Sequence, residues 1–242
     1  MVSAAALAAA PAFADRVLLG SDYLQTLDGT TFPSVGAMMG VPIGPGNADT
    51  IVRRLGNCDL TLSLAGSNCT IDIEMVALSL VSVADLSFRV RESPTLQSLG
   101  RMTMTSDGGG NGGTFDSFFD VFFEISFDGG SNYTAAPGPL RLESFQTPWT
   151  TTPLVPTLFV DGLVGDLLAN RHLDRISNCP PGVGDCTDFY FSRVREIHPD
   201  GAIHVAGPAI AVPEPGALAL AAMGLGLMAG LRRRRVTTPQ AD

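Results

Sequence analysis

The sequence contains no lysine: all 15 basic residues of the 242-residue chain are arginines. A P-loop lysine, a Schiff-base lysine and a Ser-Lys dyad are therefore excluded. No HExxH, GxSxG, CxxC or Cys-His catalytic signature occurs either. These absences predict a protein that is not an enzyme, although a Ser-His-Asp site assembled from distant loops stays open.

The chain also has fewer basic residues than acidic ones, and its net charge is −9. Four of its arginines lie together at 232–235, so the rest of the chain is more acidic still. An acidic body argues against nucleic acid and against an anionic membrane as its partners, and it is compatible with cations.

One row of carboxylates could bind a cation. Asp116, Asp120 and Glu124 share one face of an expected strand, but positions four apart on a strand lie about 13 Å apart. They cannot meet at one ion without partners from neighbouring strands, so we interpret the row as an acidic solvent face and expect no cofactor. Structural calcium is the alternative, with further oxygen ligands from the loop carboxylates Asp107, Asp128, Asp161 and Asp166.

Two weaker motifs have ordinary explanations. Gly108, Gly110 and Gly113 fit GxGxxG, but the run that follows has the pattern of a strand and not of a helix. We therefore expect a hairpin loop there. Of the three histidines (His172, His198 and His204), the last two could approach each other across a hairpin, without an apparent third metal ligand.

The C-terminal tail has three parts in a fixed order. The residues Val212-Pro213-Glu214-Pro215 come first, an uncharged apolar block follows at 216–231, and Arg232, Arg233, Arg234 and Arg235 come last. The apolar block has 231 − 215 = 16 residues, about 24 Å as a helix, against a hydrocarbon core of roughly 30 Å. We expect it to be the single transmembrane helix, with the arginines on the cytoplasmic side.

This tail closely resembles the PEP-CTERM sorting signal of bacterial envelope proteins. The resemblance implies that an exosortase, a membrane-embedded cysteine protease, recognises the tail and cleaves near Glu214-Pro215. An ordinary single-pass anchor is the alternative. Four further stretches, at 20–23, 47–55, 74–83 and 115–122, resemble a recurring ectodomain of PEP-CTERM proteins, and that resemblance implies no activity.

The N-terminus also indicates export. An apolar run at 2–10 leads to Ala12-Phe13-Ala14, a small-x-small pattern that predicts cleavage by signal peptidase before Asp15. The positively charged n-region of a signal peptide is missing, so we expect the true start to lie upstream. The expected organisation is a signal peptide at 1–14, an ectodomain at 15–211, the sorting signal at 212–235 and a cytoplasmic tail at 236–242.

Four cysteines in an exported protein favour two disulfides. Cys179 and Cys186 flank a run of turn-forming residues, so their ends can meet. We expect residues 57–68 to form a loop closed by Cys58 and Cys69, because the arms of a tight hairpin would hold these sulfurs too far apart. Crossed pairings stay open. A zinc site is not expected, since neither pair has the two-to-four-residue gap of such sites.

The ectodomain has the pattern of an all-β protein, a β-sandwich or jelly roll. Short strands are expected at 50–55, 86–91, 101–105, 140–143, 158–160, 188–195 and 202–206, whereas 26–49 and 147–156 are expected to be irregular. At 71–80 the apolar phase shifts by one residue, which predicts a bulge near Met75-Val76.

The strongest expected strand, at 115–127, should be central. Its pattern points one row of side chains into the core: Phe119, Val121, Phe123, Ile125 and Phe127.

These observations predict an exported, non-enzymatic protein, displayed on the surface or held in the extracellular matrix. Its expected partners are signal peptidase, an exosortase and the inner membrane, and the family resemblance adds the exopolysaccharide of a biofilm matrix. The alternative is a calcium-stabilised carbohydrate-binding module in which Trp149, Tyr133 or Tyr190 stacks on sugar rings, or, less favoured, a secreted hydrolase.

Overall fold

Antiparallel strands dominate the computed structural model, which describes residues 15–44, 46–152, 186–187 and 189–210. No helix occurs within these residues, so the all-β class is confirmed. The strands are β1 (Asp15–Val17), β2 (Gly20–Thr26), β3 (Thr31–Phe32), β4 (Gly36–Gly40), β5 (Thr50–Arg54), β6 (Cys58–Leu60), β7 (Asn68–Ser82), β8 (Arg89–Glu92), β9 (Ser98–Ser106), β10 (Gly112–Val121), β11 (Phe123–Ser126), β12 (Thr134–Ala135), β13 (Leu140–Thr150), β14 (Cys186–Thr187), β15 (Val194–Ile197) and β16 (Ile203–Pro208).

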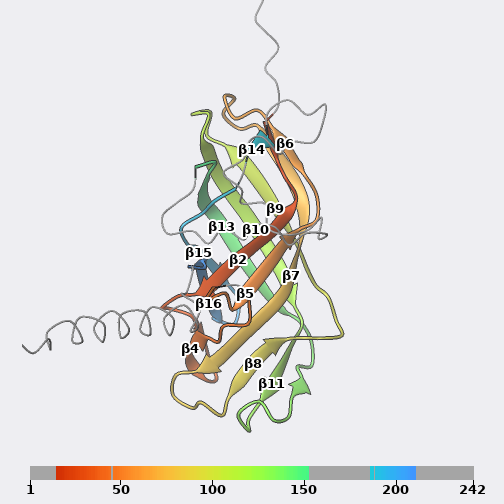
Figure 1. The fold of residues 1–242 in the computed structure, drawn as a ribbon, viewed down its shortest axis with the longest axis vertical. Helices are drawn as coiled ribbons and strands as arrows, with labels where there is room; N and C mark the ends of the chain where they lie inside the picture. The colour runs from red at the N-terminus through yellow and green to blue at the C-terminus, as the bar shows by residue number, and fades with distance from the viewer. Residues whose placement is uncertain (1–14, 45, 153–185, 188, 211–242) are drawn as a thin grey trace, which may run out of the picture. The chain divides into compact units, whose positions relative to one another are not determined.

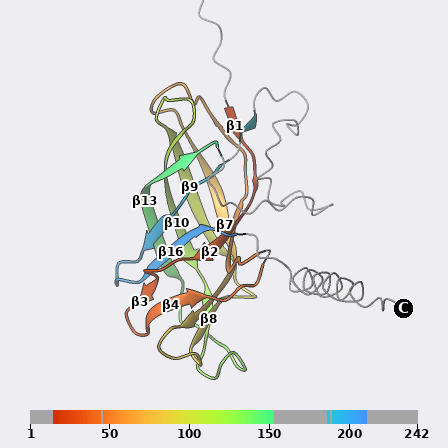
Figure 2. The same ribbon diagram turned by 60° about the vertical axis from the view of Figure 1, so that its left-hand side comes forward.

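Eight strands close into one barrel-like sheet, visible in Figures 1 and 2. Its order is β7-β5-β2-β16-β15-β13-β10-β9 and back to β7, and every neighbouring pair is antiparallel. The β13–β15 junction is the shortest, with Glu143 opposite Ile197 as its register pair. Closure gives the inward side chains of all eight strands one shared interior.

The long strand β7 belongs to two sheets. Its first part pairs with β9 and β5, and its last residues pair with β4 and β8. Strand β8 pairs in turn with β11, and β11 pairs with β12. The predicted bulge is confirmed: Ile51 lies opposite Ala77 and Val52 opposite Met75, so Val76 is the extra residue. A separate small sheet joins β14, β1 and β6.

The expected strand at 115–127 is central, as predicted, but it is divided at Phe122. Strand β10 pairs with both β9 and β13, and β11 pairs instead with β8 and β12. The Phe122 amide donates to the Ser98 hydroxyl (2.9 Å), and its carbonyl accepts from the Ser93 amide (2.8 Å). A side chain thus takes the place of ladder pairing at Phe122, and the strand changes sheet there.

This change of sheet explains one wrong prediction. Phe119 and Val121 are buried and Phe123 and Ile125 are partly buried against the core, but Phe127 is 73 % exposed. Phe127 follows the end of β11 and packs edge-to-face on Phe88, with ring centroids 5.3 Å apart.

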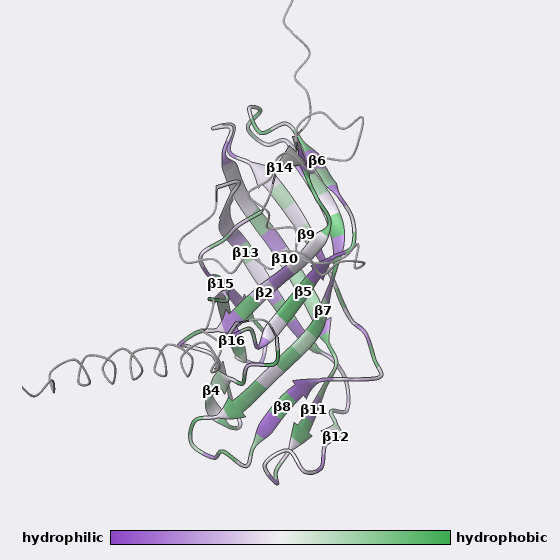
Figure 3. Ribbon diagram, viewed as in Figure 1, coloured by the Kyte–Doolittle hydropathy of each residue, from purple (hydrophilic) through white to green (hydrophobic). Residues whose placement is uncertain are grey.

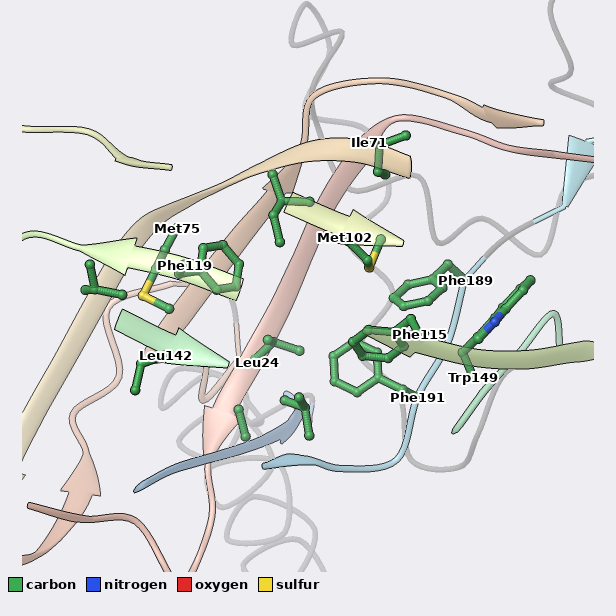
Figure 4. Close-up of a cluster of buried hydrophobic side chains, with 14 of the residues drawn as sticks. Leu24, Ile71, Met75, Met102, Phe115, Phe119, Leu142, Trp149, Phe189 and Phe191 are labelled. Carbon is green, nitrogen blue, oxygen red and sulfur yellow. The ribbon is translucent and has the colours of Figure 1, made fainter. Parts of the chain in front are cut away.

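The core fills the interior of the barrel-like sheet. Figure 4 shows Phe115, Phe189, Phe191 and Trp149 gathered at one end, and the rings of Phe115 and Phe189 lie 5.3 Å apart. Figure 3 shows apolar residues along β5 and β7, whereas β8 is mostly hydrophilic. The described residues belong to one compact unit that ends at Ile210.

Two segments expected to be irregular contain strands. Residues 26–49 hold β3 and β4, and Gly36 (φ +75°) permits the turn between them. Residues 147–150 belong to β13, whose Trp149 is buried. Glycine and proline obscured both strands, because they mark turns and close approaches between strands as well as loops.

Candidate functional site

Two groups of charged residues lie inside the barrel-like sheet, and neither was predicted. The first is the ion pair of Asp22 on β2 and Arg54 on β5, whose carboxylate oxygen and guanidinium nitrogen are 3.3 Å apart. The Arg54 guanidinium also lies 5.5 Å from the centre of the Phe189 ring. A cavity of about 30 Å³ adjoins the pair, with aromatic walls that include Phe115 and Phe119. This volume suits one or two water molecules.

The second group is a hydrogen-bonded chain that joins β15, β16, β2 and the start of β5. Glu196 on β15 lies opposite His204 on β16, and Glu196 Oε2 is 2.9 Å from His204 Nδ1. His204 Nε2 is 3.5 Å from the Thr26 hydroxyl, which donates to Asp49 Oδ1 at 2.7 Å. Asp49 also accepts from the Thr50 hydroxyl at 2.8 Å.

The order acid, imidazole, hydroxyl is that of a nucleophilic triad. Here the Thr26 proton points to the Asp49 carboxylate and not to the imidazole, and both His204 and Glu196 are buried. The arrangement therefore satisfies buried polar groups and ties β15 and β16 to β2 and to the residues before β5. Gly40 makes room for it, since a Cβ there would lie 1.6 Å from Asp49 Oδ2.

The sequence carried a usable signal for this interior. Asp22 is two positions from the buried Leu24, and Arg54 is two positions from Val52, so each charged residue lies on the same side of its strand as an apolar residue. Inward alternation therefore places a carboxylate and a guanidinium on the core faces of two short strands.

The three carboxylates of the acidic row each have their own partner. Asp120 binds Arg141 (3.1 Å), and Glu124 binds Arg91 (2.6 Å). Asp116 accepts a hydrogen bond from the backbone amide of Gln146 at 2.7 Å. The row does not converge on one point, as its spacing implied, but it is a set of cross-strand interactions and not a plain solvent face.

The loop carboxylates are held by their own turns. Asp107 accepts from the Gly109 amide at 2.7 Å within the hairpin between β9 and β10, so the glycine-rich stretch is the predicted hairpin loop. Hydrogen bonds from Asn132 lower the pKa of Asp128 to about 2. Among the described residues, no group of three or more His, Cys, Asp or Glu side chains is placed to hold a metal ion. Asp161 and Asp166 lie outside those residues.

The three aromatic residues named for the carbohydrate-binding alternative are not free to stack on a sugar. Trp149 and Tyr190 are buried in the core, so neither presents a face to a sugar. Tyr133 is partly exposed, but the Arg91 guanidinium covers its ring at 3.8 Å.

The two described histidines have separate partners. His204 binds Glu196, and His198 Nδ1 lies 2.5 Å from Asp200 in the turn between β15 and β16. The Ala202 amide and His198 together lower the pKa of Asp200. His172 lies outside the described residues.

The structure forms the predicted disulfide between Cys58 and Cys69, with Cα atoms 5.7 Å apart. It joins β6 to the start of β7. Cys186 lies on β14, and its expected partner Cys179 is outside the described residues.

The predicted targeting segments also lie outside the described residues. They include Ala12, Ala14, the motif Val212-Pro213-Glu214-Pro215 and the arginines 232–235, whereas Asp15 begins β1. Among the described residues, no helix has the length and apolar character needed to cross a membrane.

Residues 211–235 match the family model of the PEP-CTERM protein-sorting motif. The chain therefore carries a PEP-CTERM protein-sorting motif in this segment. The motif implies an exported protein whose membrane-anchored precursor lies in the envelope and is processed by an exosortase. A search of the curated proteins found no match, and neither did a search of the solved structures. The resemblance of the ectodomain to other PEP-CTERM ectodomains stays a prediction.

Proposed function

We propose that this chain is a non-enzymatic envelope protein whose β-sheet domain is displayed outside the inner membrane and released there by exosortase cleavage near Glu214-Pro215. The sorting motif at 211–235 carries this proposal, because it directly follows the last described residue, Ile210. The arginines 232–235 favour a cytoplasmic C-terminus.

Two features of the domain support a structural role. Its buried ionisable groups bind one another, as Asp22 binds Arg54 and Glu196 binds His204. The cavity beside Asp22 and Arg54, at about 30 Å³, is far smaller than the roughly 300–1,000 Å³ of typical ligand pockets. In this role the mature domain resides in the matrix of exported polysaccharide as a displayed structural component.

The sorting step is tested by following the precursor in the cells that produce it. Glu214→Ala and Pro215→Ala should leave the full-length chain in the membrane fraction, whereas Thr238→Ala, beyond the arginine cluster, should be processed as the parent is. Mass spectrometry of the mature parent protein should find a C-terminus upstream of Arg232. A mature protein that still carries Arg232 to Arg235 would contradict the proposal and indicate an ordinary anchor.

A further inference from the structure

The described fold continues almost to the start of the sorting signal. After β16, the Ala209 amide donates to the Tyr23 carbonyl (2.9 Å), and Ile210 is held on both sides by Asn47. The Asn47 amide donates to the Ile210 carbonyl (3.3 Å), and the Ile210 amide donates to Asn47 Oδ1 (2.7 Å). Asn47 Nδ2 in turn binds Gln25 Oε1 on β2. The last residue before the tail is thus fixed to the sheet.

The loop that holds Ile210 is itself well anchored. The Val41 amide donates to the Ser79 carbonyl (2.8 Å), and the Ile43 and Gly44 amides both donate to the Ala48 carbonyl (2.8 and 3.0 Å). We call residues 41–44, 46–47 and 208–210 the exit rim. Their hydrogen bonds hold them as one surface around the point where the chain leaves the domain.

The exit rim differs from the rest of the protein in charge. In a chain of net charge −9, none of its residues is ionisable. Its loop exposes Pro42 and Ile43, the latter at 51 %, and Met39 on the adjoining strand β4 is 44 % exposed. The nearest acid in sequence, Asp49, is buried and bound by Thr26 and Thr50. An uncharged, partly apolar surface avoids the repulsion that acidic side chains meet at anionic lipid headgroups.

The short segment between Ile210 and the apolar block limits how far the exit rim can lie from the membrane. Only residues 211–215 separate Ile210 from the apolar block at 216–231, and five residues span at most about 18 Å when fully extended. A headgroup layer of roughly 6 Å takes up part of that length. The apolar block is also shorter than the hydrocarbon core, which draws its flanking residues toward the membrane.

We propose that the exit rim lies on the outer surface of the inner membrane in the anchored precursor, with Ile43 inserted among the lipid headgroups. This inference rests on the proposed function, because it requires the sorting tail to anchor the chain. Exosortase cleavage would then release the domain from the membrane surface, since one apolar side chain and a neutral loop give only weak binding without the anchor.

The experiment uses the full-length precursor in vesicles of phosphatidylethanolamine and phosphatidylglycerol that contain a lipid with a nitroxide in its headgroup region. Ile43→Trp is the main probe and Met39→Trp the second, each compared with the parent protein, whose only tryptophan, Trp149, is buried. Leu64→Trp is the matched control: Leu64 is 60 % exposed in the turn between β6 and β7, and Figure 1 shows β6 and β4 toward opposite ends of the sheet.

If the new tryptophan of the Ile43→Trp variant inserts to about 5–10 Å, the nitroxide should quench its fluorescence roughly twofold, and its emission maximum should shift to the blue. Met39→Trp should respond in the same direction and Leu64→Trp should not. Precursor that floats with the vesicles while neither Ile43→Trp nor Met39→Trp is quenched would overturn the exit-rim proposal alone. An equal response at Leu64→Trp would overturn it as well. Precursor that stays in the aqueous fraction would contradict both this inference and the anchoring on which the proposed function depends.

Discussion

Asp22 and Arg54 form an ion pair across neighbouring strands in the interior, with side chains 5 % and 1 % exposed. Charges so far from water are stable only when paired, because each has lost its hydration. The pair lies on the β2–β5 junction, where it favours the register that brings these two charges together. We infer that its role is to specify the pairing of β2 with β5 more than to add net stability.

Removing one partner should therefore be costly. Asp22→Ala leaves the Arg54 charge buried without its carboxylate and should lower the free energy of unfolding by about 3–5 kcal/mol. Asp72→Ala is the matched control, since Asp72 and Arg101 form an ion pair of similar length (3.5 Å) but are 69 % and 60 % exposed. Its cost should stay under about 1 kcal/mol. Urea unfolding of both variants measures the difference, and equal losses would show that the interior pair is not specially sensitive.

A second prediction concerns Glu92 and pH. Burial raises the pKa of Glu92 from 4.5 to about 7, helped by the charges of Glu74 and Glu124, although the hydrogen bond from Ser98 opposes the shift. The folded state thus holds this proton more tightly than the unfolded state does. The contribution of Glu92 to stability is fully present below pH 4.5 and is lost as the pH rises through about 7.

Glu92→Gln should remove this part of the pH dependence. We expect the variant to match the parent near pH 4.5 and to become the more stable protein above pH 7, as measured by urea midpoints across that range. Glu74→Gln removes one of the neighbouring charges and should reduce the slope without abolishing it. Parallel profiles for Glu92→Gln and the parent would show that Glu92 titrates normally.

The third prediction compares two phenylalanines from the same expected strand. Phe119→Ala empties a buried site in β10 and should lower the free energy of unfolding by roughly 3–5 kcal/mol. Phe127→Ala removes a ring that is 73 % exposed and contacts Phe88, so it should cost no more than about 1.5 kcal/mol. Thermal or urea unfolding separates the two. A larger loss at Phe127 would contradict the division of this strand at Phe122.

Local patterns predicted the parts of the fold that depend on alternation. The phase shift in β7 located the bulge at Val76, and the aromatic row of β10 located a central strand. Alternation could not show that the strand changes sheet at Phe122, because the cause is a hydrogen bond that the Phe122 backbone amide donates to the Ser98 hydroxyl, more than twenty residues away in sequence. Trp149 was misjudged for a similar reason: the prolines near it suggested a loop, yet its strand pairs with β10 and its ring packs on Phe189.

The interior charges needed knowledge of the tertiary structure. The parity of Asp22 and Arg54 was visible in the sequence, but only the pairing of β2 with β5 brings them together. The chain Glu196, His204, Thr26, Asp49 joins residues that are up to 178 positions apart. The sorting tail could be recognised from the sequence because it is one continuous segment whose three parts follow each other in a fixed order.

The last prediction concerns the disulfide between Cys58 and Cys69. The bond closes a loop across a sequence separation of 11 and holds β6 against the start of β7. Loop-closure entropy for this length corresponds to about 3 kcal/mol, so the double variant Cys58→Ala/Cys69→Ala should lose roughly 2–4 kcal/mol of unfolding free energy. Because Cys58 is buried, part of the loss comes from packing, which the single variant Cys69→Ala in the presence of reductant helps to separate. Hydrogen exchange should show the loss as faster opening at β6 and at the first residues of β7, with β10 and β13 still protected. Uniform loss of protection across β10 and β13 would contradict this local role and place the bond among the interactions that hold the whole sheet closed.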